Sequence, residues 1–88
     1  MTKVWQRAPE VVWRRSGDRR ILTGRSTEDV VVVEGTGTLI WDALEQPAPE
    51  DDLVGEFSDR FGVEAEQVRE ELTSFLGEIH SMGLVTSR

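Results

Sequence analysis

Runs of apolar residues divide the chain into a strand-rich first third and a helical remainder. Three short β-prone segments come first, at residues 10–15, 19–23 and 29–34, separated by turn residues at 16–18 and 24–27. The third segment contains four consecutive valines, whose branched side chains favour an extended backbone. Because the connections are short, we expect an antiparallel meander with the third strand at one edge.

Apolar residues then recur at helical spacing in three segments. The first follows Gly35-Thr36-Gly37, the second runs from Pro49 to Gly62, and the last runs from about Glu64 to Met82. Each helix has an apolar stripe to bury, so the helices should cover one face of the sheet. The predicted fold class is α+β, a winged helix-turn-helix-like arrangement of a three-stranded antiparallel sheet followed by three helices. We expect an N-terminal arm over residues 1–9 and a single domain over residues 10–86.

The valine run at residues 30–33 does not fit a sheet that is covered on one face only. Such a strand normally alternates apolar and polar residues, so two of the valines must point away from the helices unless the N-terminal segment around Trp5 covers them. The run also contains no Lys, Pro or bulge, the usual devices that protect an exposed edge. An edge of this kind suits the addition of an extended peptide as a further strand. Both interpretations, a covered strand and an open edge, are compatible with the sequence.

A helical wheel of the last helix, at roughly 100° per residue, separates a core stripe from one shoulder. The stripe consists of Val68, Leu72, Phe75, Ile79 and Met82. Leu76 lies on the shoulder, and Arg69, Thr73 and His80 lie just beyond it. We expect this shoulder to line a groove shared with the third strand. A boundary position partly covered by the core is the alternative for Leu76.

Charge argues against a nucleic-acid partner. The net charge is −7, and residues 31–88 contain three Lys or Arg against thirteen Asp or Glu. The last helix, which would enter DNA in a winged-helix protein, carries Glu64, Glu66, Glu70, Glu71 and Glu78 against Arg69. A recognition helix needs basic and amide side chains at the groove. A winged-helix DNA-binding regulator is therefore the disfavoured alternative from a different functional class.

The chain offers little material for catalysis, metal binding or membrane insertion. It has no cysteine, and His80 is its one histidine. Gly35-Thr36-Gly37 lacks the Lys-Ser/Thr end of a phosphate loop. We therefore expect no catalytic residues, no metal and no cofactor. No apolar stretch approaches the ~20 residues of a membrane span, and the N-terminus lacks the apolar core of a signal peptide, so we expect a cytoplasmic protein without a membrane partner.

Several segments, in order and spacing, resemble the PqqD-like family, also called the recognition element of ribosomally made and modified peptides (RiPPs). They are the valine strand, Gly37-Thr38-Leu39-Ile40-Trp41-Asp42-Ala43-Leu44, the Pro-Glu-Asp-Asp-Leu start and Phe-Ser-Asp-Arg-Phe-Gly end of the second helix, Val68-Arg69-Glu70-Glu71-Leu72 with Phe75-Leu76 and Ile79, and Met82-Gly83-Leu84-Val85. The resemblance covers about residues 10 to 86. Glu34-Gly35 departs from the Leu-Asn found in many members.

The resemblance implies a peptide-binding function. Such domains bind the leader of a precursor peptide as an added strand beside the third strand and against the third helix, and deliver it to a modifying enzyme or protease. The groove then falls on Val30, Val31, Val32, Val33, Glu34, Arg69, Leu72, Thr73, Leu76 and His80. The chain looks most like the leader-binding subunit of a split lasso-peptide system, whose partner is a separate cysteine leader peptidase. The alternative pathway is pyrroloquinoline quinone biosynthesis with a radical-SAM partner, which the Glu34-Gly35 departure weakens.

Overall fold

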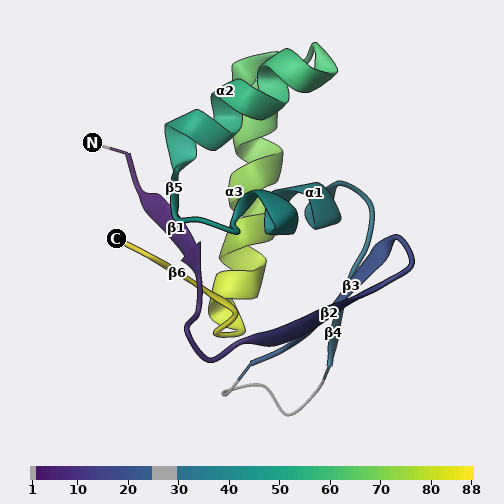
Figure 1. Ribbon diagram of the computed structural model, residues 1–88. Coiled ribbons are helices and arrows are strands. Elements are labelled where there is room, and N and C mark those ends of the chain that lie inside the picture. Colours follow the sequence, from purple (N-terminus) through teal and green to yellow (C-terminus); the bar gives the residue numbers. More distant parts are fainter. Residues whose placement is uncertain (1, 25–29) are drawn as a thin grey trace.

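The first sheet has the topology that the sequence predicts. The computed structural model describes residues 2–24 and 30–88 (Figure 1). Strands β2 (Val12–Ser16), β3 (Arg19–Thr23) and β4 (Val31–Val33) form an antiparallel sheet in the order β2-β3-β4. The predicted meander with its third strand at an edge is confirmed. The expected turn after β3 and the start of the third strand at Asp29 fall largely on residues 25–29, outside the described residues.

A second small sheet was not predicted. Strands β1 (Val4–Arg7), β5 (Ala48–Pro49) and β6 (Val85–Ser87) pair antiparallel in the order β5-β1-β6. β1 also joins the two ends of the chain, because Val4 and Arg88 exchange backbone hydrogen bonds of 2.9 and 3.0 Å. Residues 4–7 of the segment expected to be an arm therefore form a strand of the folded domain. These strands are only two to four residues long, too short for an alternating pattern to reveal them.

Three helices complete the α+β fold: α1 (Thr36–Ala43), α2 (Glu50–Phe61) and α3 (Ala65–Ser81). α2 ends where predicted, at Gly62, whose φ of 64° is left-handed and strains any residue with a Cβ. Figure 1 shows α3 at the centre, with β1 and β6 on one side of it and α1 and the first sheet on the other. No helix within the described ranges is long and apolar enough to cross a bilayer.

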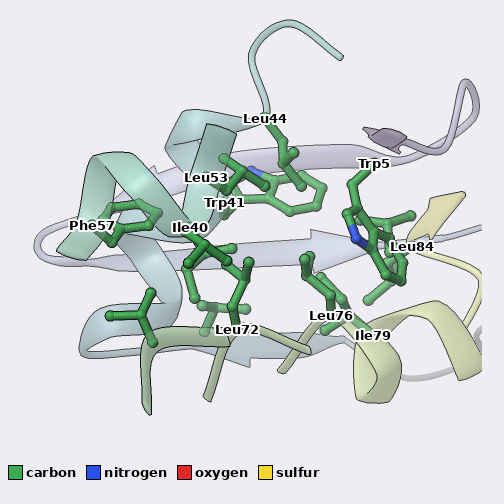
Figure 2. Packing of buried hydrophobic residues seen from close by; sticks show 14 of the residues in the cluster. Trp5, Ile40, Trp41, Leu44, Leu53, Phe57, Leu72, Leu76, Ile79 and Leu84 are labelled. Atoms are coloured by element: carbon green, nitrogen blue, oxygen red, sulfur yellow. The ribbon is translucent and has the colours of Figure 1, made fainter. Parts of the chain in front are cut away.

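The core forms where α1, α2 and α3 meet the two sheets. Figure 2 shows Trp41 and Leu53 facing Leu72 and Leu76 across this space. Leu76 has no exposed surface, so its predicted place on the shoulder of α3 is wrong. The buried residues of α3 are Val68, Leu72, Leu76 and Ile79. Phe75 and Met82, which the wheel places in the core stripe, are only partly buried. The buried face of α3 is therefore rotated about the helix axis from the predicted stripe toward Leu76.

Two arginines connect the first sheet to α1 and to β1. Arg20 of β3 is 7% exposed and donates from Nε and a terminal nitrogen to the two carboxylate oxygens of Asp42 on α1, at 2.9 and 2.8 Å. These hydrogen bonds lower the pKa of Asp42 below its usual value. Arg7 of β1 lies 4.7 Å from the ring centroids of both Trp13 and Trp41. The position of the first sheet relative to α1 is therefore held by planar, directional contacts.

Candidate peptide-binding site

The free edge of β4 is the first part of the candidate site. β4 pairs with β3, and no other strand within the described ranges lies beside it. Val31 pairs with Leu22 and Val33 with Arg20, whose side chains are both buried. Val32 therefore points to the opposite face of the sheet, where it is 51% exposed.

The N-terminal segment does not cover that outer face. Trp5 is 4% exposed, but it is buried in the second sheet, where its indole Nε1 donates to Glu50 at 3.1 Å. Val30, just before β4, is 58% exposed. Of the two interpretations left open by the sequence, a strand covered by Trp5 is wrong. The open strand edge agrees with the structure.

A groove of about 260 Å³ lies between β4 and α3. Its lining residues are Val31, Val32, Val33, Glu34, Thr36, Gly37, Phe75, Glu78, Ile79 and Met82. Glu34, at the end of β4, also forms an exposed ion pair with Arg19 at 2.7 Å. The prediction that α3 and the third strand share a groove therefore agrees with the structure. The residues that α3 contributes are not the predicted ones.

The predicted polar residues of α3 lie on its other flank. Arg69 donates to Glu50 and to Asp51 of α2, both at 2.7 Å. Thr73 donates to the backbone oxygen of Arg69 at 2.8 Å. The His80 ring meets Trp5 edge to face at 5.9 Å. These side chains face β1 and α2, so their predicted place in a groove with β4 is wrong.

The two predicted leucines do not reach the groove either. Leu72 is 1% exposed and Leu76 is 0% exposed, and both belong to the core. Neither leucine lines the groove between β4 and α3, although Leu72 lines a neighbouring hollow between α1, α2 and α3. A helical wheel identifies the apolar stripe, but it does not say which strand will cover each flank. Because β1 was not predicted, nothing in the sequence pattern assigned Arg69, Thr73 and His80 to it.

Phe75 is one of the groove residues that the sequence pattern did not assign to the site, together with Glu78, Ile79 and Met82 of the same helix. A Cβ at Gly37 would lie 2.8 Å from the Phe75 ring and 2.9 Å from Val33 Cγ1, so only glycine lets the start of α1 approach both. Gly37 lies in the first turn of α1 and does not have a positive φ. A glycine in a helix that its backbone conformation does not require indicates close approach of another group. Gly37 in the first predicted helix was therefore the residue in the sequence that could have pointed to a tight contact here.

Phe75 also separates the groove from a second hollow of about 250 Å³ between α1, the end of α2 and α3. Thr36, Gly37 and Phe75 line both. Within residues 2–24 and 30–88, no group of three His, Asp or Glu is placed to hold a metal ion. The groups that the site presents are backbone amides and carbonyls at a strand edge, apolar side chains and carboxylates. These groups recognise an extended peptide.

Comparison with known proteins gives one match. The family model described as "Coenzyme PQQ synthesis protein D (PqqD)" matches residues 20–85, three quarters of the 88-residue chain. No curated protein and no solved structure matches. The matched range contains β4, α3 and the groove between them. The protein therefore belongs to the PqqD family, whose members recognise the leader of a ribosomally made precursor peptide and are not themselves catalytic.

Proposed function

We propose that this protein binds the leader of its precursor peptide as a fourth strand beside β4 and delivers the peptide to a separate processing enzyme. The observation that carries the proposal is the free β4 edge beside a groove whose far wall is α3. Backbone groups of the edge supply hydrogen bonds that are independent of sequence. Side-chain pockets of the groove then supply selectivity.

The other edge of the same sheet is a poorer docking place. β2 carries Arg14 and Arg15, which are both exposed, and charged side chains on an edge strand discourage strand addition. β4 consists of valines only. The groove lies beside β4, where Phe75 and Met82 offer apolar surface and Glu78 adds a charge. We therefore assign the leader to β4.

For the pathway, we favour a lasso-peptide system in which the partner is a cysteine leader peptidase. The residue pair Glu34-Gly35 after β4, where many members of the family carry Leu-Asn, weakens the assignment to the pyrroloquinoline quinone pathway. Pyrroloquinoline quinone biosynthesis with a radical-SAM partner is the alternative. A neighbouring peptidase gene together with an asparagine-synthetase-like cyclase gene would indicate the lasso pathway, and a neighbouring radical-SAM gene would indicate the alternative.

The test of leader binding is a nuclear magnetic resonance titration of the labelled chain with the leader of the neighbouring precursor gene. We expect amide shifts concentrated on residues 30–34 of the strand and on Phe75, Glu78 and Met82 of α3. Arg69, Thr73 and His80 should shift little, which makes them the internal control. Shifts that are absent, or spread thinly over the surface, would exclude leader binding at this edge.

A further inference from the structure

We infer that a hollow between β2 and the end of α1 is a binding site for a carboxylate, which the side chains of Arg7 and Arg15 hold. The hollow has a volume of about 240 Å³ and is lined by Arg7, Trp13, Arg15, Asp42 and Glu45. It lies on the β2 side of the first sheet, whereas β4 is the opposite edge of that sheet. The site is therefore separate from the leader-binding edge proposed above.

Arg7 is a cation whose hydrogen-bonding capacity is largely unused within the protein. Its guanidinium lies 4.7 Å from the ring centroids of both Trp13 and Trp41, and one terminal nitrogen donates to the backbone oxygen of Trp41 at 2.7 Å. Its Nε is buried and has no acceptor among the described residues. Burial lowers the pKa of Arg7 below its ordinary value. Since a guanidinium has five N–H donors, an anion in the hollow supplies acceptors to a cation that is partly withdrawn from water.

The charge balance of the lining favours a monoanion. Asp42 repels an anion little, because Arg20 donates to both of its carboxylate oxygens, at 2.9 and 2.8 Å. Arg7 and Arg15 then face one remaining carboxylate, that of Glu45. Arg15 and Glu45 are exposed, and neither forms an ion pair with any residue in 2–24 and 30–88. The lining therefore has an excess of one positive charge, which a carboxylate neutralises.

The alternation of side chains along β2 brings the two arginines of the site to one face. Trp13 and Arg15 pair with buried residues of β3, so both point to the inner face of the sheet. Arg14 pairs with Ile21 and points to the outer face, away from the hollow. Arg7 lines the same hollow from β1. A carboxylate accepts two parallel hydrogen bonds from one guanidinium, and the Trp13 ring offers an apolar wall to the carbon chain that bears the carboxylate.

Two sources of the carboxylate are compatible with the hollow. β2 has a strand on one side only within the described part of the chain, so a polypeptide segment paired along its free edge can place an acidic side chain in the hollow. A small free carboxylate can enter the hollow directly. The chemistry at Arg7 and Arg15 is the same in both cases, and the ligand used in a titration separates them.

A nuclear magnetic resonance titration with sodium acetate, which replaces sodium chloride at constant ionic strength, tests the site. At about pH 6 the added carboxylate is ionised. We expect saturable shifts of the side-chain Nε–H of Arg7 and of the indole N–H of Trp13. The indole N–H of Trp5, which donates to Glu50 in the second sheet, should not move. Sodium sulfate, whose anion is a tetrahedral dianion, should bind more weakly than acetate.

A second titration identifies the source of the carboxylate. It uses a pentapeptide of sequence Thr-Val-Asp-Val-Thr with both ends blocked, and the same peptide with Asn in place of Asp as its control. An affinity that exceeds that of acetate tenfold or more assigns the carboxylate to a polypeptide paired along β2, because backbone hydrogen bonds then add to the ion pair. Any smaller gain assigns it to a small free solute.

Four variants locate the anion. Arg15→Gln should weaken acetate binding about two- to fivefold, and Glu45→Gln should tighten it about two- to fivefold by removing a repelling carboxylate. Arg14→Gln removes the same charge from the outer face of β2, so it is the matched control and should leave the affinity unchanged. Arg7→Lys keeps the charge but loses the planar fork, and it should weaken binding about tenfold. Circular dichroism checks its fold, and the other three variants decide the matter should it unfold.

Several results would overturn the carboxylate site. Shifts that stay linear with acetate concentration, or that Trp5 shows equally, mean that no specific site exists. Tighter binding of sulfate than of acetate overturns the assignment to a carboxylate. A loss of affinity in Arg14→Gln as large as that in Arg15→Gln means that acetate is attracted to the general charge of β2. Unchanged affinity in both Arg15→Gln and Glu45→Gln, with the fold intact, places the anion elsewhere.

Discussion

The two flanks of α3 differ in what covers them, although each carries polar and apolar side chains. On the first flank, here called the closed flank because β1 and α2 engage its side chains, Arg69 is paired with Glu50 and Asp51 while its side chain stays 43% exposed. The exposed His80 meets Trp5 edge to face on the same flank. On the open flank, Phe75 and Met82 line a groove beside β4. The composition of the helix does not distinguish these flanks. The strand that lies against each flank does, and a two- to four-residue strand can decide which face of a helix is available to a ligand.

The largest expected effect tests whether Leu76 belongs to either flank. It is fully buried, so Leu76→Ala should lower the free energy of unfolding by about 2–5 kcal/mol through cavity formation. Leu72→Ala should cost a similar amount, because Leu72 is equally buried. Met82→Ala, on the partly exposed open flank, should cost clearly less. Urea unfolding of the three variants is the measurement. A near-normal stability of Leu76→Ala would contradict the burial of Leu76 and support its original place at the boundary of the core.

The case of Leu76 shows what the sequence could and could not predict. Local signals sufficed for the meander, since the valines of β4 and the turn at Gly17 specify strands and their connection. The ends of α2 were equally readable from Pro49 and Gly62. The wheel of α3 had Leu72 and Ile79 correctly in the core. It could not decide between Leu76 and Phe75 as the remaining core position, because both lie within reach of the stripe.

The candidate site divides in the same way. Val31, Val32, Val33 and Glu34 line the observed groove, because an unprotected strand edge is visible in the sequence. The contributions of α3 were missed, because they depend on contacts between segments far apart in the chain. Trp5 closes one flank from a position 75 residues before His80. No local pattern contains that contact.

The second prediction concerns Gly37, whose close contacts with Phe75 and Val33 set the position of the groove wall on the open flank. Gly37→Ala introduces a Cβ 2.8 Å from Phe75 and 2.9 Å from Val33, so one or both must move. Overpacking of this kind costs about 1–3 kcal/mol, partly offset by the better helix propensity of alanine. Leader affinity should fall as well, because Phe75 lines the groove.

Gly55 in α2 provides the control for that change, since a Cβ there meets nothing within 4 Å. Gly55→Ala should raise stability by roughly 0.5–1 kcal/mol and leave leader affinity unchanged. Thermal melts and titration calorimetry on both variants make the comparison. If Gly37→Ala instead stabilises the protein as Gly55→Ala does, the Phe75 ring can move aside at little cost, and Gly37 is not needed to keep the groove wall in place.

The third prediction compares a substitution on the open flank with one on the closed flank. Met82→Ala should weaken leader binding about three- to tenfold, since an apolar contact of the groove wall is removed. Arg69→Ala should leave the affinity unchanged and lower the melting temperature slightly, because both its ion pairs hold α2 and not the groove. Calorimetric titration with the leader measures the first effect. A loss of affinity in Arg69→Ala that exceeds the loss in Met82→Ala would place the peptide on the closed flank.

The smallest expected effect concerns the contact that places the first sheet, and with it β4, opposite α3. Hydrogen bonds from Arg20 lower the pKa of Asp42 in the folded protein, while in the unfolded chain it returns to about 3.9. The stability from this pair is therefore fully present above that unfolded pKa and is lost as the pH falls through the lower folded value. Asp42→Asn should be less stable than the parent at pH 6, and the difference should shrink below about pH 4. Urea unfolding across this range gives the difference directly. A stability difference that is the same at both ends of the pH range would mean that Asp42 acts through its shape in the packing and not through its charge.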